Sequence, residues 1–88
     1  MYAVVGRSTI QDFDQARKFL RDEGIPRLSQ MPGFVTGHWV KLDENTGASM
    51  IVFETEEAAR AAKERFESDP PPSVTPVSLE IGEVQEHA

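Results

Sequence analysis

The chain has 88 residues, of which 39% are hydrophobic, and a formal net charge of −6 from 15 acidic and 9 basic side chains. This composition is typical of one small globular domain and excludes a disordered chain. The acidic balance disfavours nucleic acid and anionic membranes as partners, and the lack of cysteine excludes disulfides and thiolate metal sites. We expect a cytoplasmic protein, because the N-terminus has no signal-peptide pattern and no apolar run is long enough to span a bilayer.

The first third of the chain predicts a strand followed by a helix. Residues 2–7, YAVVGR, form a β-branched run typical of a short strand. Ser8 and Thr9 are then the expected N-caps of a helix whose apolar side chains recur every three or four residues. These side chains are Ile10, Phe13, Ala16 and Leu20. A glycine and a proline predict a break or kink at 24–26, with one further helical turn through Leu28.

The middle of the chain predicts a hairpin. MPG, residues 31–33, ends the helix, and apolar runs at 34–42 and 48–54 are typical of strands. The polar DENTG segment between them, residues 43–47, has the composition of a turn. The two strands are therefore expected to pair antiparallel.

The last third predicts a second helix and a final strand. Thr55 is the expected N-cap of a helix with small inward side chains, which allow close approach to a sheet. These are Ala58 or Ala59, Ala62 and Phe66. The proline-rich segment 68–73 is a stiff connection to a strand at 74–84, in which Pro76 indicates an edge position or a bulge.

The element order β-α-β-β-α-β predicts a single α+β domain over residues 1–88 with the ferredoxin-like arrangement. Two helices would cover one face of a four-stranded antiparallel sheet. The strands, however, are apolar on both faces: Val4 alternates with Val5, and Ile51 with Met50 and Val52. Because an exposed apolar sheet is unfavourable, we expect a homodimer in which the two helix-free faces pack together into a barrel.

The whole chain resembles the dimeric α+β barrel superfamily, and in particular its antibiotic biosynthesis monooxygenase-like members. The similar features are PGF, residues 32–34, at the start of the second strand, and VFETEEAARAA, residues 52–62, at the junction of third strand and second helix. The resemblance implies a cleft between sheet and helices in each subunit, where family enzymes work without flavin or metal, or bind haem. The haem-degrading branch is disfavoured, because Arg7 and Phe53 replace its asparagine and tryptophan and the second helix has no histidine. No cofactor is therefore expected.

Four residues are the candidate site. If Phe34 packs under the first helix, alternation along the strand turns Thr36 and His38 toward the cleft and Trp39 toward the partner subunit. The alternative for Trp39 is a place in the lining of a ligand site. His38 is then a candidate general base, because an imidazole titrates near neutral pH, and Thr36 a candidate substrate-binding residue. The alternative for His38 is a partly buried histidine with a backbone or water partner.

Arg7 is a candidate for orienting a substrate oxyanion or carboxylate from the end of the first strand. The alternative is an ion pair with Glu80 or Glu83. Phe53 is the second candidate substrate-binding residue.

Two functions follow from these residues. One is cofactor-independent oxidation of an aromatic or polyketide-like molecule in the cleft. The other is a non-catalytic dimer that binds a small apolar or aromatic ligand or serves as an accessory protein. A convergent polar set in the cleft favours the first, and a cleft filled by side chains favours the second.

Overall fold

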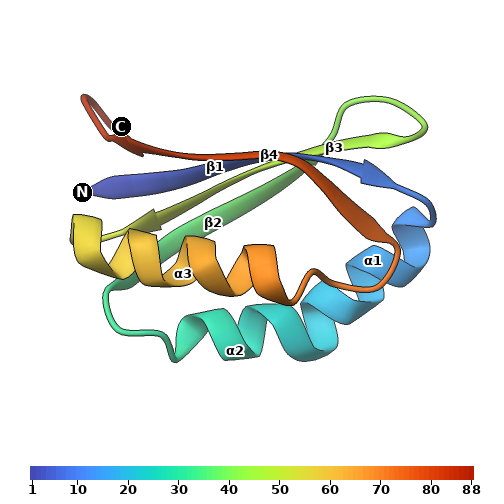
Figure 1. The fold of residues 1–88 in the computed structure, drawn as a ribbon, viewed down its shortest axis with the longest axis horizontal. Coiled ribbons are helices and arrows are strands. Elements are labelled where there is room, and N and C mark those ends of the chain that lie inside the picture. The colour runs from blue at the N-terminus through green and yellow to red at the C-terminus, as the bar shows by residue number, and fades with distance from the viewer.

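The computed structural model describes residues 1–88 as a four-stranded antiparallel sheet with all helices on one face (Figure 1). The strands are β1 (Tyr2–Ile10), β2 (Phe34–Lys41), β3 (Thr46–Phe53) and β4 (Val74–Glu83), in the spatial order β2-β3-β1-β4. The helical segments are α1 (Phe13–Phe19), η1 (Leu20–Gly24), α2 (Ile25–Ser29) and α3 (Glu56–Ser68). The predicted element order is confirmed, and β4 is an edge strand whose register shifts beside Pro76. None of these helices has the length and apolarity that crossing a membrane requires.

The first helix begins later than the sequence predicts. β1 continues to Ile10, and the N-cap is Asp12, whose carboxylate accepts a hydrogen bond from the backbone N–H of Gln15 at 3.1 Å. Ser8 and Thr9 have the side chains of N-caps, but both are paired with β3 and with β4. Strand pairing on both sides therefore overrides the local capping signal.

The helix does not break at 24–26. It stays continuous and contains a wider π-helical turn, η1, immediately before α2. In this turn the backbone N–H of Ile25 donates to the carbonyl of Leu20, five residues earlier. Pro26 has no N–H and its ring collides with the preceding turn of a regular helix, so one extra residue in that turn accommodates it.

The turn between β2 and β3 is held by a side chain, at the position predicted for it. The carboxylate of Asp43 accepts a hydrogen bond from the backbone N–H of Asn45 at 2.9 Å. This bond, with a second from the Thr46 side chain, holds the pKa of Asp43 below its ordinary value, because both stabilise the charged form.

A β-bulge near the start of β2 changes which side chains face the helices. Phe34 is paired with Phe53, but the next pair joins Thr36 to Val52, so that Val35 has no partner on β3. One extra residue in a strand reverses the face of every side chain after it, relative to simple alternation from Phe34.

The predicted orientations of Thr36, His38 and Trp39 are therefore wrong. His38 is opposite Met50 and, like Thr36, lies on the helix-free face of the sheet. Trp39 is opposite Ser49 and packs against the core on the helix side. The bulge is the physical reason, since without it the alternation from Phe34 would hold.

The core lies under α2 and α3. Its buried side chains are Val4, Leu28, Ile51, Phe53, Ala59 and Ala62. Ala59 and Ala62 are completely buried, as the small-residue stripe predicts, and Phe53 is packed edge-on against Phe34 with ring centroids 6.1 Å apart.

The helix-free side of the sheet, here called the open face, is partly apolar. Its exposed hydrophobic side chains include Val5, Val40 and Met50, which are 45%, 51% and 46% exposed. The prediction of strands with two apolar faces is therefore confirmed. The same face carries polar side chains such as His38 and Glu80.

Candidate functional site: a helix–sheet cleft

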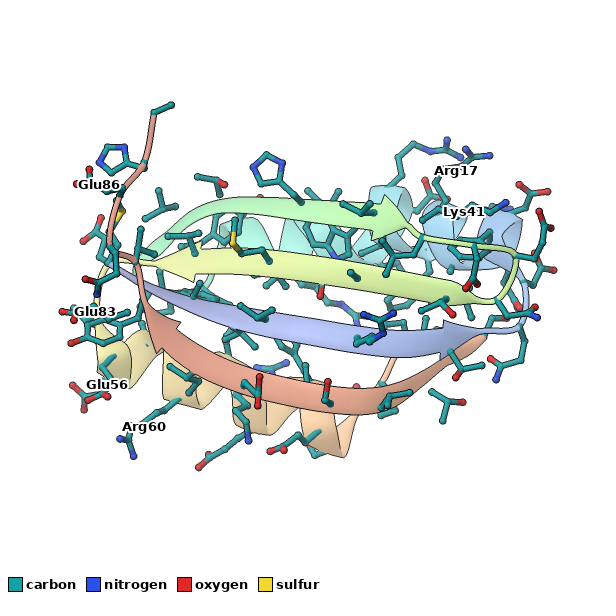
Figure 2. The ribbon with its side chains drawn as sticks, turned by 90° about the horizontal axis from the view of Figure 1, so that it is seen from above. Arg17, Lys41, Glu56, Arg60, Glu83 and Glu86 are labelled. Atoms are coloured by element: carbon teal, nitrogen blue, oxygen red, sulfur yellow. The ribbon has the colours of Figure 1, made fainter.

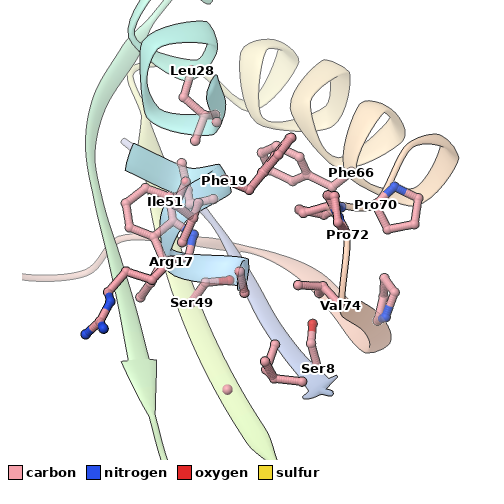
Figure 3. Close-up of a pocket in the computed structure, with 18 of the residues that line it drawn as sticks. Ser8, Arg17, Phe19, Leu28, Ser49, Ile51, Phe66, Pro70, Pro72 and Val74 are labelled. Atoms are coloured by element: carbon pink, nitrogen blue, oxygen red, sulfur yellow. The ribbon is translucent and has the colours of Figure 1, made fainter. Parts of the chain in front are cut away.

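A cleft of about 840 Å³ lies between the sheet and the helices (Figure 3). Its walls come from α1, η1 and α2, from the end of α3, and from the proline segment 70–72 before β4. Half of the residues that line it are hydrophobic. This volume and this lining are typical of sites for small organic molecules.

The cleft exists because the inward side chains become small halfway along β1 and β3. Near the core the inward pairs are Tyr2 with Phe53 and Val4 with Ile51. Further along they are Gly6 with Ser49 and Ser8 with Gly47. Large side chains thus fill one end of the space under the helices, and small ones leave the other end empty. In the sequence this change is visible as small residues at every second position of the two strands. It can be recognised as a cleft only when the register of the strands is known.

Trp39 lies along the cleft because its neighbour is a glycine. A β-carbon placed on Gly37 would be 2.7 Å from the Cη2 atom of the indole, which is closer than such atoms approach in proteins. The ring therefore lies over Gly37 and forms part of the lining. The partner-facing orientation expected from the sequence is therefore wrong, and the alternative, in which Trp39 lines a ligand site, agrees with the structure.

Replacing Gly37 with alanine is expected to displace the indole. The change should shift the fluorescence emission of Trp39, the only tryptophan, and lower stability by roughly 1–3 kcal/mol, as overpacking typically does. Gly82→Ala is the matched control, because a β-carbon there meets no atom within 4 Å. Identical emission spectra for Gly37→Ala and the parent protein would contradict this arrangement of the ring.

The polar groups of the cleft are two hydroxyls inside and charged side chains at the rim. Ser8 and Ser49 lie on its sheet side. The charged lining residues are Asp14, Arg17, Arg27, Lys41, Arg65 and Asp69. The hydroxyls are able to donate or accept hydrogen bonds, and the rim is able to bind an ion. No three histidine, aspartate or glutamate side chains lie together in a group that could hold a metal ion.

None of the four predicted site residues lines this cleft. Thr36 and His38 lie on the open face, where the Thr36 hydroxyl is 3.3 Å from Nε2 of His38. Arg7 lies on the same face, between Ala48 and Ser78 of the neighbouring strands.

The other sequence predictions for these residues also change. Arg7 forms no ion pair, so the predicted alternative with Glu80 or Glu83 does not occur within the protomer. Phe53 has an exposed fraction of 0% and belongs to the core rather than to the cleft, because it lies at the filled end of the sheet.

Comparison with known proteins identifies the fold. No family model and no curated protein matches the sequence. Among solved structures, HapK from Hahella chejuensis is 12% identical with a TM-score of 0.67, covering 100% of this chain and 96% of HapK. A dimeric ferredoxin-like protein from an uncultured marine organism is 12% identical with a TM-score of 0.61, covering 100% and 98%. A Bacillus cereus protein proposed to be an antibiotic biosynthesis monooxygenase is 18% identical with a TM-score of 0.59, covering 99% and 91%.

These likenesses extend over nearly the whole of each chain. At such identities they define the fold, which is the ferredoxin-like fold that the sequence predicts. The resemblance to the monooxygenase-like α+β proteins is thereby confirmed at the level of the fold.

Proposed function

We propose that this protein is a homodimer that binds an aromatic or polyketide-like small molecule in the helix–sheet cleft and oxidises it without a cofactor. The observation that carries the proposal is the cleft itself, whose apolar walls include Phe19, Trp39 and Phe66. Flat aromatic walls suit a planar ligand, since stacked and edge-on ring contacts stabilise the bound ligand beyond the gain from burying its apolar surface. The fold likeness to the Bacillus cereus protein supports oxidation as the reaction class.

The proposed reaction converts a methylene group, activated by neighbouring carbonyl or phenol groups, into a carbonyl. One oxygen atom of O₂ enters the product, the other leaves as water with the two methylene hydrogens, and the substrate supplies the electrons. The hydroxyls of Ser8 and Ser49 would stabilise the oxyanion of the enolised substrate by hydrogen bonds, and the apolar walls would exclude water.

A non-catalytic binding or accessory role is the second candidate. It is favoured by the lining, which contains no histidine, and by the position of His38 on the open face. The cleft therefore offers no histidine as a general base, its two carboxylates, Asp14 and Asp69, lie at the rim, and deprotonation would depend on the acidity of the substrate itself.

The proposed homodimer would form by contact between the open faces of two copies. Val5, Val40 and Met50 are exposed there beside the covered side chain of Val52, and a second copy would remove them from water. The marine protein of the same fold is described as dimeric, which supports a dimer as the assembly.

Binding can be measured through Trp39. We expect 1,8-dihydroxyanthrone, a tricyclic phenol with an oxidisable methylene, to quench its fluorescence saturably with a Kd of roughly 10–100 µM, typical of a ligand of this size. Ser49→Leu should weaken binding at least about tenfold by filling the cleft. His38→Gln, on the open face, is the control and should leave binding unchanged.

Oxygen uptake separates the two candidate functions. Consumption of one O₂ per anthrone, faster than without protein and abolished by Ser49→Leu, is the result expected of the oxidase. Saturable binding without accelerated uptake would establish the binding role instead. Quenching that does not saturate, or that Ser49→Leu leaves unchanged, would overturn the assignment of the cleft.

A further inference from the structure

The charge of the cleft is opposite to that of the whole protein. Its lining contains four cationic side chains and two acidic ones, a net of two positive charges, on a chain whose net charge is −6. The residues outside the lining therefore carry a net of eight negative charges. A concave site of one sign on a protein of the other attracts ligands of complementary charge, which here means anions.

Two of the four cations lie together at one end of the cleft. The ammonium group of Lys41 is 4.8 Å from the centroid of the Phe13 ring, and Arg17 follows Phe13 by one helical turn. Figure 2 shows Arg17 and Lys41 at the same end of the molecule. Lys41 forms no ion pair. Arg17 contacts Asp14 at 3.1 Å, but both side chains are more than three-quarters exposed, so this pair is weak and readily exchanged for a ligand.

The other two cations belong to other helices, α2 and α3. Arg27 is paired with Glu23, which lies outside the lining, at 3.0 Å. Arg65 is one helical turn before Asp69, so an acidic residue of the lining lies near it in the chain.

The arrangement along β2 suggests how a ligand would lie. Trp39 and Lys41 are two residues apart on the same side of the strand, about 7 Å along its axis. A ring system beside the Trp39 indole would therefore place an acidic substituent near Lys41. We infer that the ligand of the cleft is an aromatic or polyketide-like acid whose carboxylate or acidic enol is bound by Lys41 and Arg17. This inference rests on the proposed function of the cleft and specifies its ligand.

A matched pair of probes tests it. Anthraquinone-2-carboxylate and anthraquinone-2-carboxamide have nearly the same shape and differ in charge. Binding of each probe is measured by the quenching of Trp39 fluorescence. At low ionic strength we expect the carboxylate to bind about five- to tenfold more tightly than the carboxamide. This preference should fall below about twofold in 0.5 M NaCl, because salt screens exposed charges.

The preference should disappear in the double variant Arg17→Gln/Lys41→Gln, because the affinity for the carboxylate should fall to that for the carboxamide. The matched control is Lys18→Gln/Arg21→Gln, which also removes two positive charges, but from residues of α1 and η1 that do not line the cleft. Equal binding of both probes by the parent protein would overturn the anion site but leave the proposed function intact. Binding of neither probe would overturn the proposed function. A preference retained in Arg17→Gln/Lys41→Gln, or lost equally in the control, would overturn the assignment to these two residues.

Discussion

Met50→Asp is expected to convert the proposed dimer into monomers. Met50 is 46% exposed in the protomer and is paired with Val5 on one side and His38 on the other, in the middle of the open face. In a two-fold dimer each copy would bring one new carboxylate into the contact, beside Val5 on one strand and His38 on the other. Removing a charge from water costs several kcal/mol, so association should weaken at least about 100-fold. Sedimentation equilibrium should give twice the chain mass for the parent protein and the chain mass for the variant.

Ile25→Asp is the control for this experiment. It makes the same change from apolar to acidic at a side chain that is 39% exposed, but in α2, on the opposite side of the molecule from the open face (Figure 1). Its dimer should persist. A parent protein that stays monomeric and cooperatively folded at micromolar concentration would refute the dimer, and a dimeric Met50→Asp would move the contact to another surface.

Phe53→Ala is expected to cause the largest loss of stability. The side chain is completely buried among Val4, Ile51 and Phe34, and truncation of a buried phenylalanine typically costs about 3–5 kcal/mol. Domains of this size have a free energy of unfolding of only about 5–15 kcal/mol. Thermal denaturation followed by circular dichroism should therefore show a melting temperature lower by roughly 15–30 °C.

Phe53→Leu is the graded control, since it keeps most of the buried volume and should cost about 1 kcal/mol. The experiment also decides between core and site. If Phe53→Ala kept its melting temperature but lost affinity for the anthrone, Phe53 would be a ligand-binding residue, as the sequence first indicated, and its assignment to the core would be wrong.

The sequence determined the order and type of the elements, because these depend on short-range patterns. Short apolar runs bounded by turn residues predict β2 and β3, and the stripe with Ala59 and Ala62 predicts the helix that lies close to the sheet. The two apolar faces, with Val4 on one and Val5 on the other, also follow from the two-residue period of a strand.

Other features depended on contacts between segments far apart in the chain. Ser8 and Thr9 carry local signals for capping, and only their pairing with two neighbouring strands moves the N-cap to Asp12. For the same reason, the sequence located the irregularity caused by Pro26 but not the form of the helical turn that accommodates it.

The candidate site was decided by tertiary structure alone. One unpaired residue, Val35, turns Trp39 into the cleft and His38 away from it, and nothing in the sequence of β2 marks that residue as a bulge. The floor of the cleft likewise depends on the register that places Gly6 opposite Ser49. Local sequence fixes the period of a strand, whereas its register and its bulges are set by the fit of its side chains to those of the neighbouring strand and the covering helices.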